Sequence, residues 1–397
     1  MVIKFWLIFI TMFPVMVSVA EAAQQEKALE KKEVSSSSTT ETPNAGTLEN
    51  ETILKLGGFG TLGALSSSQT HGDYVLDSFM PNGAGRSTDL DLNNYSKFAL
   101  QVNALFTPKV SGQLQVISAY SADGSFQPDI EWYNLKYIIN NEIAFRVGRV
   151  ELSTFMDSGN HDVGYSYAWA HLPIEMYHLL SIQTSDGIDA TYRTKIGDSI
   201  NSLKLLFGQN TGDRPTSIST SKDMLGLFDT FEYNQITVNL SLQKRNSSVQ
   251  NKSTGLSNGW YESSDLSIGI EYDPGNWFFI SEWIQSHTRY NSAAIYASAG
   301  YRINKFTPYI IHSQNNAGSF PTGSTPSISS VMHADRSQKT DSLGVRWDFM
   351  KNYDFKFQFD QIMLSDQSNG FLINVPSNVL LYGDTFYTVS AVVDFVF

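Results

Sequence analysis

The stretch TFYTVSAVVDFVF (Thr385–Phe397) at the end of the chain presents two different faces. Successive residues of a β-strand point to opposite sides. One face therefore carries apolar side chains, at positions 387, 389, 391, 393, 395 and 397. The other face carries Thr388, Ser390 and Asp394. A strand with one lipid-compatible face and one polar face suits the wall of a transmembrane barrel.

The same period of two begins at Ile53 and returns throughout the chain, which marks a series of half-exposed strands. Sixteen segments show it: 53–65, 95–106, 110–121, 130–140, 142–150, 183–194, 198–209, 224–233, 235–246, 263–273, 276–287, 291–302, 304–315, 338–350, 352–366 and 384–397. This number of strands is even, so both ends of the sheet are expected on the same side of the membrane.

The gaps between these segments alternate in length. Short gaps hold turn residues, such as Thr107-Pro108-Lys109 and Asp273-Pro274-Gly275. Most of the others are longer: 66–94, 150–182, 210–223, 247–262, 316–337 and 367–383. Short periplasmic turns and long external loops are typical of outer-membrane barrels, whereas a β-sandwich would not require this alternation. The sequence predicts an all-β fold, a transmembrane antiparallel up-and-down barrel of about sixteen strands.

The first 51 residues have a different composition. A lysine, an apolar run (FWLIFITMFPVMVSV) and Ala20-Glu21-Ala22 predict a signal peptide, residues 1–22, that is cleaved after Ala22. A membrane anchor is the weaker alternative, because the apolar run is short. Residues 23–51 are rich in Glu, Lys, Ser and Thr and predict a periplasmic polar linker or a short helical arm. The barrel would occupy residues 52–397.

The overall composition excludes several classes of site and partner. The chain has no cysteine, which excludes disulfides and thiolate metal sites. The net charge of −12 argues against nucleic acid as a partner. Aromatic residues make up 13% of the chain, which suits the girdles that barrels place at the two membrane interfaces. No cofactor is expected.

Several stretches resemble one protein family. The C-terminal strand that ends in Phe397 resembles the insertion signal of Gram-negative outer-membrane proteins. The segment FRVGRVELSTFMDSGNHDVGYSYAW, with LPIEMYHLL and SDGIDATY after it, is similar to a block of the Gram-negative porins, in the branch with phosphate-selective-type and related sixteen-stranded channels. GGFGTLGAL resembles their first strand and SLGVRWDF a late one. The resemblance covers residues 53 to 397 and implies a trimer in the outer membrane of a Gram-negative bacterium.

The two-face rule assigns side chains to the lumen of the expected barrel. Nearly every charge within a strand falls on the polar phase, as expected, since Arg or Lys at the lipid midplane costs about 2–4 kcal/mol. The basic residues predicted to line the pore are Lys97, Lys136, Arg146, Arg193, Lys204, Arg245, Arg346 and Lys356. They outnumber the strand acids of the same phase, which predicts a mild preference for anions. Glu131 and Arg149 break the rule, and a bulge, the rim or a subunit interface would explain either.

The longest uninterrupted irregular stretch between two good strands is Val150–Ile182. A loop of this length inside a compact domain is usually functional. It is the third long loop, where the family resemblance implies a constriction folded into the lumen. The acids predicted to face the basic wall are Asp157, Asp162 and Glu175. The three histidines of the loop lie ten and seven residues apart, which fits no helical metal motif, so no metal site is expected. The loop's aromatic residues are expected to pack against the wall more readily than to form a sliding surface for a solute.

These features favour a porin, a water-filled channel with a mild preference for anions that allows passive diffusion of small hydrophilic solutes. Its partners would be outer-membrane lipid, lipopolysaccharide and two further copies of the chain. An outer-membrane lipase or protease is a weaker hypothesis, because no G-x-S-x-G motif and no placeable Ser–His pair occur. An adhesin or surface receptor acting through long loops, such as the serine-rich stretch 316–337, is the other alternative.

Overall fold

A computed structural model describes residues 52–316 and 336–397, except Ser78, Ser181, Arg289, Tyr290, Gln367, Ser377, Leu380 and Tyr382. The expected signal peptide and linker, and most of the serine-rich stretch, lie outside the described residues. The described residues of 52–302 and 306–397 form one compact unit. Within the described residues, no helix has the length and apolar character needed to cross a bilayer.

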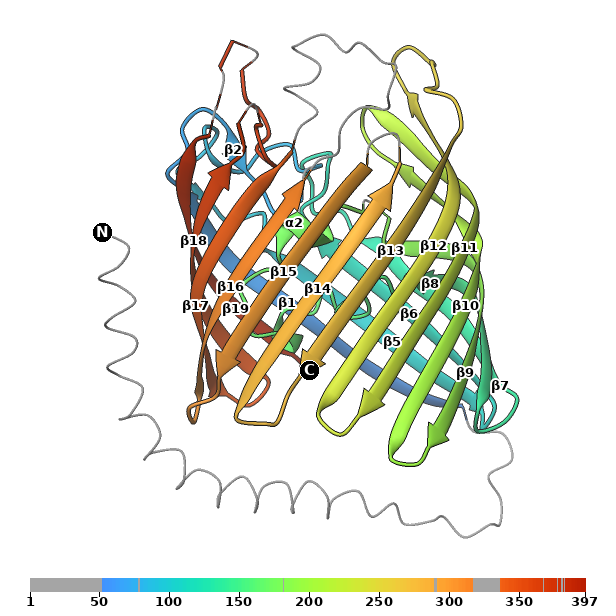
Figure 1. Ribbon diagram of the computed structural model, residues 1–397. Coiled ribbons are helices and arrows are strands. Elements are labelled where there is room, and N and C mark those ends of the chain that lie inside the picture. Colours follow the sequence, from blue (N-terminus) through green and yellow to red (C-terminus); the bar gives the residue numbers. More distant parts are fainter. Residues whose placement is uncertain are drawn as a thin grey trace. The chain divides into compact units, whose positions relative to one another are not determined.

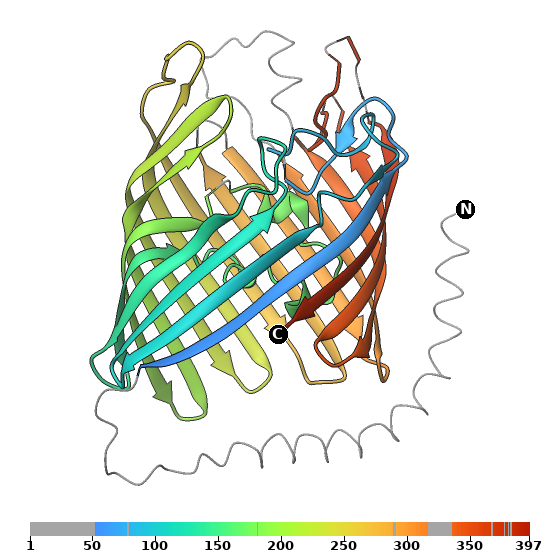
Figure 2. The ribbon, with the colours of Figure 1, turned by 180° about the vertical axis from the view of Figure 1, so that it is seen from behind.

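Sixteen long antiparallel strands close into a barrel in this unit (Figures 1 and 2). They are β1 (Ile53–Ser67), β5 (Lys97–Thr107), β6 (Val110–Ala119), β7 (Asp129–Ile138), β8 (Ile143–Glu151), β9 (Thr184–Ile196), β10 (Ser199–Asp213), β11 (Ser217–Tyr233), β12 (Ile236–Asn251), β13 (Tyr261–Tyr272), β14 (Trp277–His287), β15 (Asn291–Tyr301), β16 (Phe306–Asn316), β17 (Gln338–Met350), β18 (Tyr353–Leu364) and β19 (Thr385–Val396).

Each long strand pairs with its neighbours in sequence, and the sheet closes where β1 meets both β5 and β19. Phe59 lies opposite Val396 at one end of the β1–β19 ladder, and Ser67 lies opposite Thr388 at the other. Closure removes the free edges that an open sheet would expose. All sixteen predicted segments overlap one strand each, so the predicted up-and-down barrel is confirmed.

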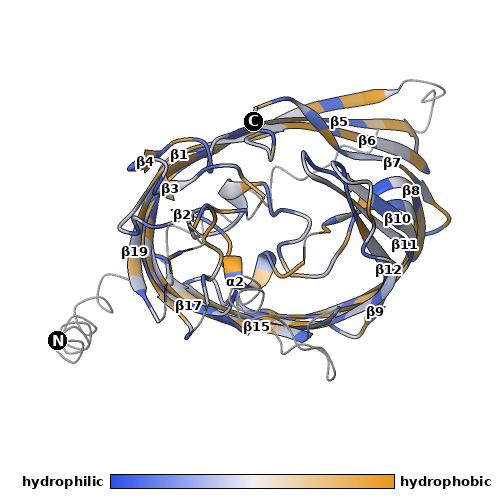
Figure 3. Ribbon diagram, turned by 90° about the horizontal axis from the view of Figure 1, so that it is seen from above, coloured by the Kyte–Doolittle hydropathy of each residue, from blue (hydrophilic) through white to orange (hydrophobic). Residues whose placement is uncertain are grey.

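The wall separates an apolar exterior from a polar interior, as the two-face rule predicts. In β18, the outward Phe357 and Phe359 are exposed, whereas Lys356, Gln358 and Asp360 point inward and have no exposed surface. Viewed from above, the strands of the ring carry hydrophilic and hydrophobic residues in succession (Figure 3). The inward residues are buried because part of the chain fills the lumen beside them.

Two predicted loops are shorter than expected because the flanking strands extend into them. The gap expected at 210–223 is an extended hairpin, since β10 continues to Asp213 and β11 begins at Ser217. A register shift between Lys222 and Leu225, with Asp223 at a positive φ of 52°, interrupts the alternation there and hid the strand from the sequence pattern. The gap expected at 247–262 is likewise shortened, because β12 runs on to Asn251.

The two residues that broke the face rule have separate explanations. Glu131 is the extra residue of a bulge, because Gln115 pairs with Trp132 and the next residue along, Val116, pairs with Ile130. Arg149 lies opposite both Tyr133 and Asp186. It forms an ion pair of 2.8 Å with Asp186, and its guanidinium lies 5.3 Å from the centre of the Tyr133 ring.

The remaining elements are short. In the first long connection, β2 (Asp73–Tyr74) pairs with β3 (Ala84–Gly85), and β4 (Leu90–Asp91) pairs with the end of β1. The connection between β8 and β9 holds a 3-10 helix, η1 (Gly164–Ser166), and one turn of helix, α2 (Ile174–Tyr177).

Candidate functional site

Residues 152–183, which connect β8 to β9, fold into the barrel and are called the inner loop. Figure 3 shows α2 inside the ring of strands. The loop leaves the wall at β8 and reaches β14 to β18 on another part of the ring, as its contacts below show. The predicted fold of a third long loop inside the lumen is therefore confirmed.

Aromatic residues hold the inner loop against the wall. Trp169 is 1% exposed and makes edge-to-face contacts with Phe278 of β14 and Tyr296 of β15. Tyr167 stacks on Trp169 with ring centres 6.2 Å apart. These rings belong to one buried cluster that also includes Met176. Their burial makes them packing residues, which was the favoured expectation over a surface for a sliding solute.

Glu282 of β14 is a polar anchor at the centre of this cluster. One carboxylate oxygen accepts hydrogen bonds from the hydroxyls of Tyr177, at 2.9 Å, and Tyr296, at 2.8 Å. The other accepts from the backbone N–H of Met156 at 2.9 Å. Two of these three donors belong to the inner loop. Sequence reasoning missed Glu282, because the inward face of β14 is mainly apolar where the loop packs and so lacks a polar phase.

Glu175 lies in the contact between α2 and the wall. It is 1% exposed. It accepts hydrogen bonds from Ser313 at 2.7 Å, from Gln338 at 2.6 Å and from Thr340 at 2.5 Å. Enclosure by three donors from β16 and β17 places Glu175 away from open water. The expectation that Glu175 faces the basic wall as a constriction acid is corrected on this ground, since its carboxylate binds neutral donors of the wall and holds the loop.

Two basic wall residues bind backbone carbonyls around η1. The guanidinium of Arg346 donates to the carbonyls of Tyr165 and Tyr167, at 2.7 and 3.0 Å. The ammonium of Lys356 donates to the carbonyl of Gly164 at 2.5 Å and pairs with Asp394 of β19 at 3.0 Å. Lys356 is fully buried, so the loop covers this part of the wall.

The other predicted basic residues are mostly paired as well. Lys97 binds Asp162 of the inner loop at 3.0 Å. Arg146 and Lys204 share Glu151, each at 2.8 Å. The further pairs are Arg146–Asp189, Arg193–Glu232, Arg245–Asp265, Arg346–Asp348 and Arg346–Asp354. Among the described residues, Lys136 is the one member of the predicted set without an ion pair, and it is exposed.

The loop acids Asp157 and Asp162 differ in their electrostatics. Burial, with the neighbouring carboxylates of Glu282 and Glu271, raises the pKa of Asp157 to about 7. Burial alone would also raise the pKa of Asp162, but His161 and Lys97 outweigh it and hold that pKa well below the usual range. Asp162 is therefore a paired anion, and Asp157 is an acid that titrates near neutral pH.

His161 completes the arrangement beside Asp162. Burial alone would lower its pKa, but the Asp162 carboxylate, 2.9 Å from Nε2, raises that pKa to about 9. His171 contacts Asp360 of β18 at 3.3 Å, which fixes another point of the loop on the wall. Among the predicted acids, the structure thus brings Asp162 to a basic partner, leaves Asp157 among acids and encloses Glu175.

Two cavities remain between the inner loop and its surroundings. One, of about 240 Å³, is lined by His161, Asp162, Lys97 and Asp77, among others. The second, of about 280 Å³, is lined by Glu131, Asp129, Asp77 and Arg214, among others. Charged side chains border both cavities, and the lining of the second is mostly polar.

Comparison with solved structures reveals the fold class. An anion-selective porin from Comamonas acidovorans has a TM-score of 0.55 and 11% identity, over 87% of this chain and 100% of that one. The outer membrane channel DcaP of Acinetobacter baumannii has a TM-score of 0.54 and 12% identity, over 87% and 97%. Salmonella typhi OmpF, solved in complex with daunomycin, has a TM-score of 0.53 and 14% identity, over 87% and 97%. The chain has the sixteen-stranded porin fold.

The porin fold is recognisable here from structure and not from overall sequence similarity. No family model matches the chain, and no curated protein matches it. At 11–14% identity, the neighbours establish the fold alone. What this porin-like barrel does must follow from its own inner surface.

Proposed function

We propose that the protein is a porin, a passive diffusion channel for small hydrophilic solutes in the outer membrane of a Gram-negative bacterium. The observation that carries the proposal is a closed sixteen-stranded barrel with a polar inner face and a loop anchored within it. Barrels of about this size leave an aqueous channel, whereas eight-stranded barrels are filled by side chains. The inner loop narrows the channel and sets its size limit.

The direct test is reconstitution of the folded protein into a planar bilayer. Discrete conductance steps are expected. Removal of residues within 157–175 is expected to raise the conductance, because the aromatic anchor at Trp169 is then lost. Folding is verified by heat-modifiable electrophoretic mobility. If the folded protein shows no conductance steps, channel function is rejected. An unchanged conductance after the deletion would mean that the inner loop does not limit the current.

The proposed selectivity is a mild preference for anions. Seven of the eight basic residues are paired with acids, so little of their charge acts on a passing ion, and Lys136 is the unpaired member in the described part of the chain. One solved neighbour is named an anion-selective porin. A reversal potential in a salt gradient measures the preference, and a clear cation preference would reject it.

The proposal includes an address and an assembly state. The signal peptide would be cleaved after Ala22, and the barrel would contact lipid and lipopolysaccharide through its apolar exterior. A homotrimer is proposed, and OmpT of Vibrio cholerae, with a TM-score of 0.53, was solved in a form described as a trimer. N-terminal sequencing of the mature protein and its mass in detergent by light scattering test these two points.

A further inference from the structure

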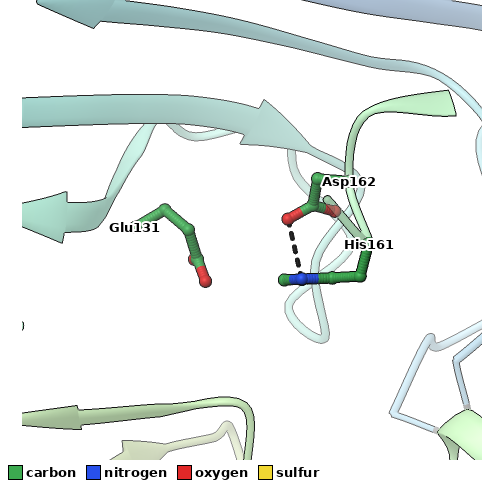
Figure 4. Close-up of side chains that lie close together, drawn as sticks. All are labelled: Glu131, His161 and Asp162. Atoms are coloured by element: carbon green, nitrogen blue, oxygen red, sulfur yellow. Dashed lines mark ion pairs between the residues drawn. The ribbon is translucent and has the colours of Figure 1, made fainter. Parts of the chain in front are cut away.

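Three metal-ligating side chains meet where the inner loop passes β7. Glu131 comes from the bulge of β7, and His161 and Asp162 come from the loop (Figure 4). Their ligand atoms all lie within 4.8 Å of one another, and this is the one such group among the described residues. Nε2 of His161 and one oxygen of Asp162 are 2.9 Å apart. The cluster thus joins the loop to the wall through side chains alone.

The imidazole of His161 is oriented toward the two carboxylates. Its Nδ1 lies 3.0 Å from the carbonyl of Ser158, which accepts a hydrogen bond from Nδ1–H. The ring also makes an edge contact with Trp132, with centres 6.4 Å apart. Metal-bound histidines are commonly fixed in this way, by donating from the nitrogen that does not bind the metal. Nε2 then faces Asp162, and a metal ion bound between these two groups would replace the proton that they share across 2.9 Å.

We propose that Glu131, His161 and Asp162 bind a divalent transition metal ion, such as Zn²⁺, that ties the inner loop to the wall. Zinc lies about 2.1 Å from nitrogen and oxygen ligands in a tetrahedral arrangement, so two of its ligand atoms are about 3.4 Å apart. His161 Nε2 and the Asp162 oxygen are 2.9 Å apart, so they would have to separate by about 0.5 Å to admit the ion. One imidazole and two carboxylates form a common ligand set for such ions. Glu131 completes the set, because its carboxylate oxygen lies within 4.8 Å of the other two ligand atoms.

The site is accessible to ions and water. His161 and Asp162 line the cavity of about 240 Å³, and Glu131 lines the cavity of about 280 Å³. Asp77 borders both cavities. A bound ion would therefore border a cavity on each side, and water molecules there can fill its remaining coordination positions.

Lys97 provides an internal competitor. Its ammonium binds one oxygen of Asp162 at 3.0 Å, whereas His161 faces the other oxygen. The ammonium places a positive charge beside the position of the metal, which repels the ion. Loss of Lys97 should therefore strengthen metal binding, although it removes an ion pair from the protein. A purely structural role for the cluster predicts no such gain.

Sequence spacing could not reveal this group. His161 and Asp162 are adjacent, Glu131 lies 30 residues earlier, and the bulge turns Glu131 away from the phase that its strand predicts. The prediction that the loop histidines bind no metal was based on helical spacings alone, and those spacings do not include a ligand from a distant strand.

The experiment is calorimetric titration of ZnCl₂ into the untagged, folded protein in detergent. We expect one ion per protomer, an affinity at least about tenfold weaker in His161→Gln and Glu131→Gln, and a tighter affinity in Lys97→Met. His312→Gln is the matched control, because His312 and Asp341 also form a 2.7 Å pair but are exposed and are not members of the three-ligand group. That variant should bind as the native protein does.

Three results would overturn the proposal: no saturable zinc binding, an affinity unaffected by Glu131→Gln, or weaker binding in Lys97→Met. Folding of each variant is verified by heat-modifiable mobility. If His161→Gln does not fold, Glu131→Gln and Lys97→Met decide the matter, since both change wall residues and leave the inner loop unaltered. The experiment measures zinc binding directly, so its result does not depend on whether the barrel conducts ions.

Discussion

Replacement of Lys356 by methionine should release the inner loop near η1. Methionine keeps the length of the side chain and removes the ammonium that binds the Gly164 carbonyl at 2.5 Å and Asp394 at 3.0 Å. Breaking a buried ion pair costs about 3–5 kcal/mol. Asp394 keeps one partner, because the hydroxyl of Thr61 donates to it at 2.5 Å, which favours the lower end of this range. A loss of about 3 kcal/mol raises the population of undocked loop about a hundredfold.

Single-channel recording measures this population directly. Lys356→Met is expected to show larger mean conductance and frequent current fluctuations. Lys136→Met is the matched control, since it removes the same charge from an exposed residue without an ion pair among the described residues. That control should keep the conductance of the native channel and lose part of the anion preference. Native conductance and noise in Lys356→Met, or the same fluctuations in both variants, would refute the anchoring argument.

Three further predictions concern the inner loop. Glu175→Gln places an amide N–H₂ among the three donors that now bind the Glu175 carboxylate, and the unsatisfied donors cost the docked loop about 1–3 kcal/mol of stability. Current fluctuations should therefore increase. Channels as quiet as those of the native protein would contradict this prediction. The pKa of Asp157 is about 7 in the docked loop, whereas that of an exposed aspartate is about 4. The docked loop therefore binds the proton more tightly, and its stability decreases as the pH rises from about 4 to about 7. The conductance of the native protein should therefore rise from pH 5 to 8, whereas that of Asp157→Asn should stay low at every pH. An equal pH dependence in both proteins would show that Asp157 is not the titrating group. Gly164→Ala puts a methyl group 2.0 Å from an Asp394 oxygen and should undock η1, whereas Gly159→Ala meets nothing within 4 Å and should conduct as the native protein does; equal traces from both would show that the close approach is unimportant.

The barrel could be predicted from the sequence because lipid imposes a simple constraint on every strand. An outward residue must be apolar, and a charge must point inward, so the alternation in segments such as Tyr353–Leu364 is visible without any partner. Turn residues separate the strands on one side. Asn234 and Asn352 adopt positive φ values of 52° and 65° there, a conformation that asparagine tolerates better than most residues.

The alternation of apolar and polar residues is lost where a strand is irregular or where its inner face packs against protein instead of water. Asp223 and Glu131 both lie at irregularities of the ladder, and one extra residue reverses the face of everything beyond it. The inward face of β14 carries Phe278, Ile284 and Glu282 because it packs against the inner loop and not against water. A pattern within one strand contains no information about which other segment covers it.

The candidate site was harder to predict for the same reason. The inner loop was identified by its irregularity and length, but its contacts join residues far apart in the chain, as in the pair of Lys97 with Asp162 and the hydrogen bond from Gln338 to Glu175. The sequence indicates that Glu175 is an acid in a loop. The enclosure of Glu175 by hydrogen-bond donors of β16 and β17 depends on the fold, because these strands lie far from the inner loop in the sequence.

Counting charges on the wall therefore overstates their effect on a passing ion. Two opposite charges about 3 Å apart act together as a dipole, whose field falls off faster with distance than that of a single charge. By this argument the pairs of Lys97, Arg146 and Lys204 contribute little to selectivity, although the pair of Lys97 with Asp162 also holds the inner loop. The exposed Lys136 acts at its full charge, screened by salt. We therefore expect selectivity to depend on the few unpaired wall charges, such as Lys136. Lys97, Arg346 and Lys356 instead hold the inner loop in place.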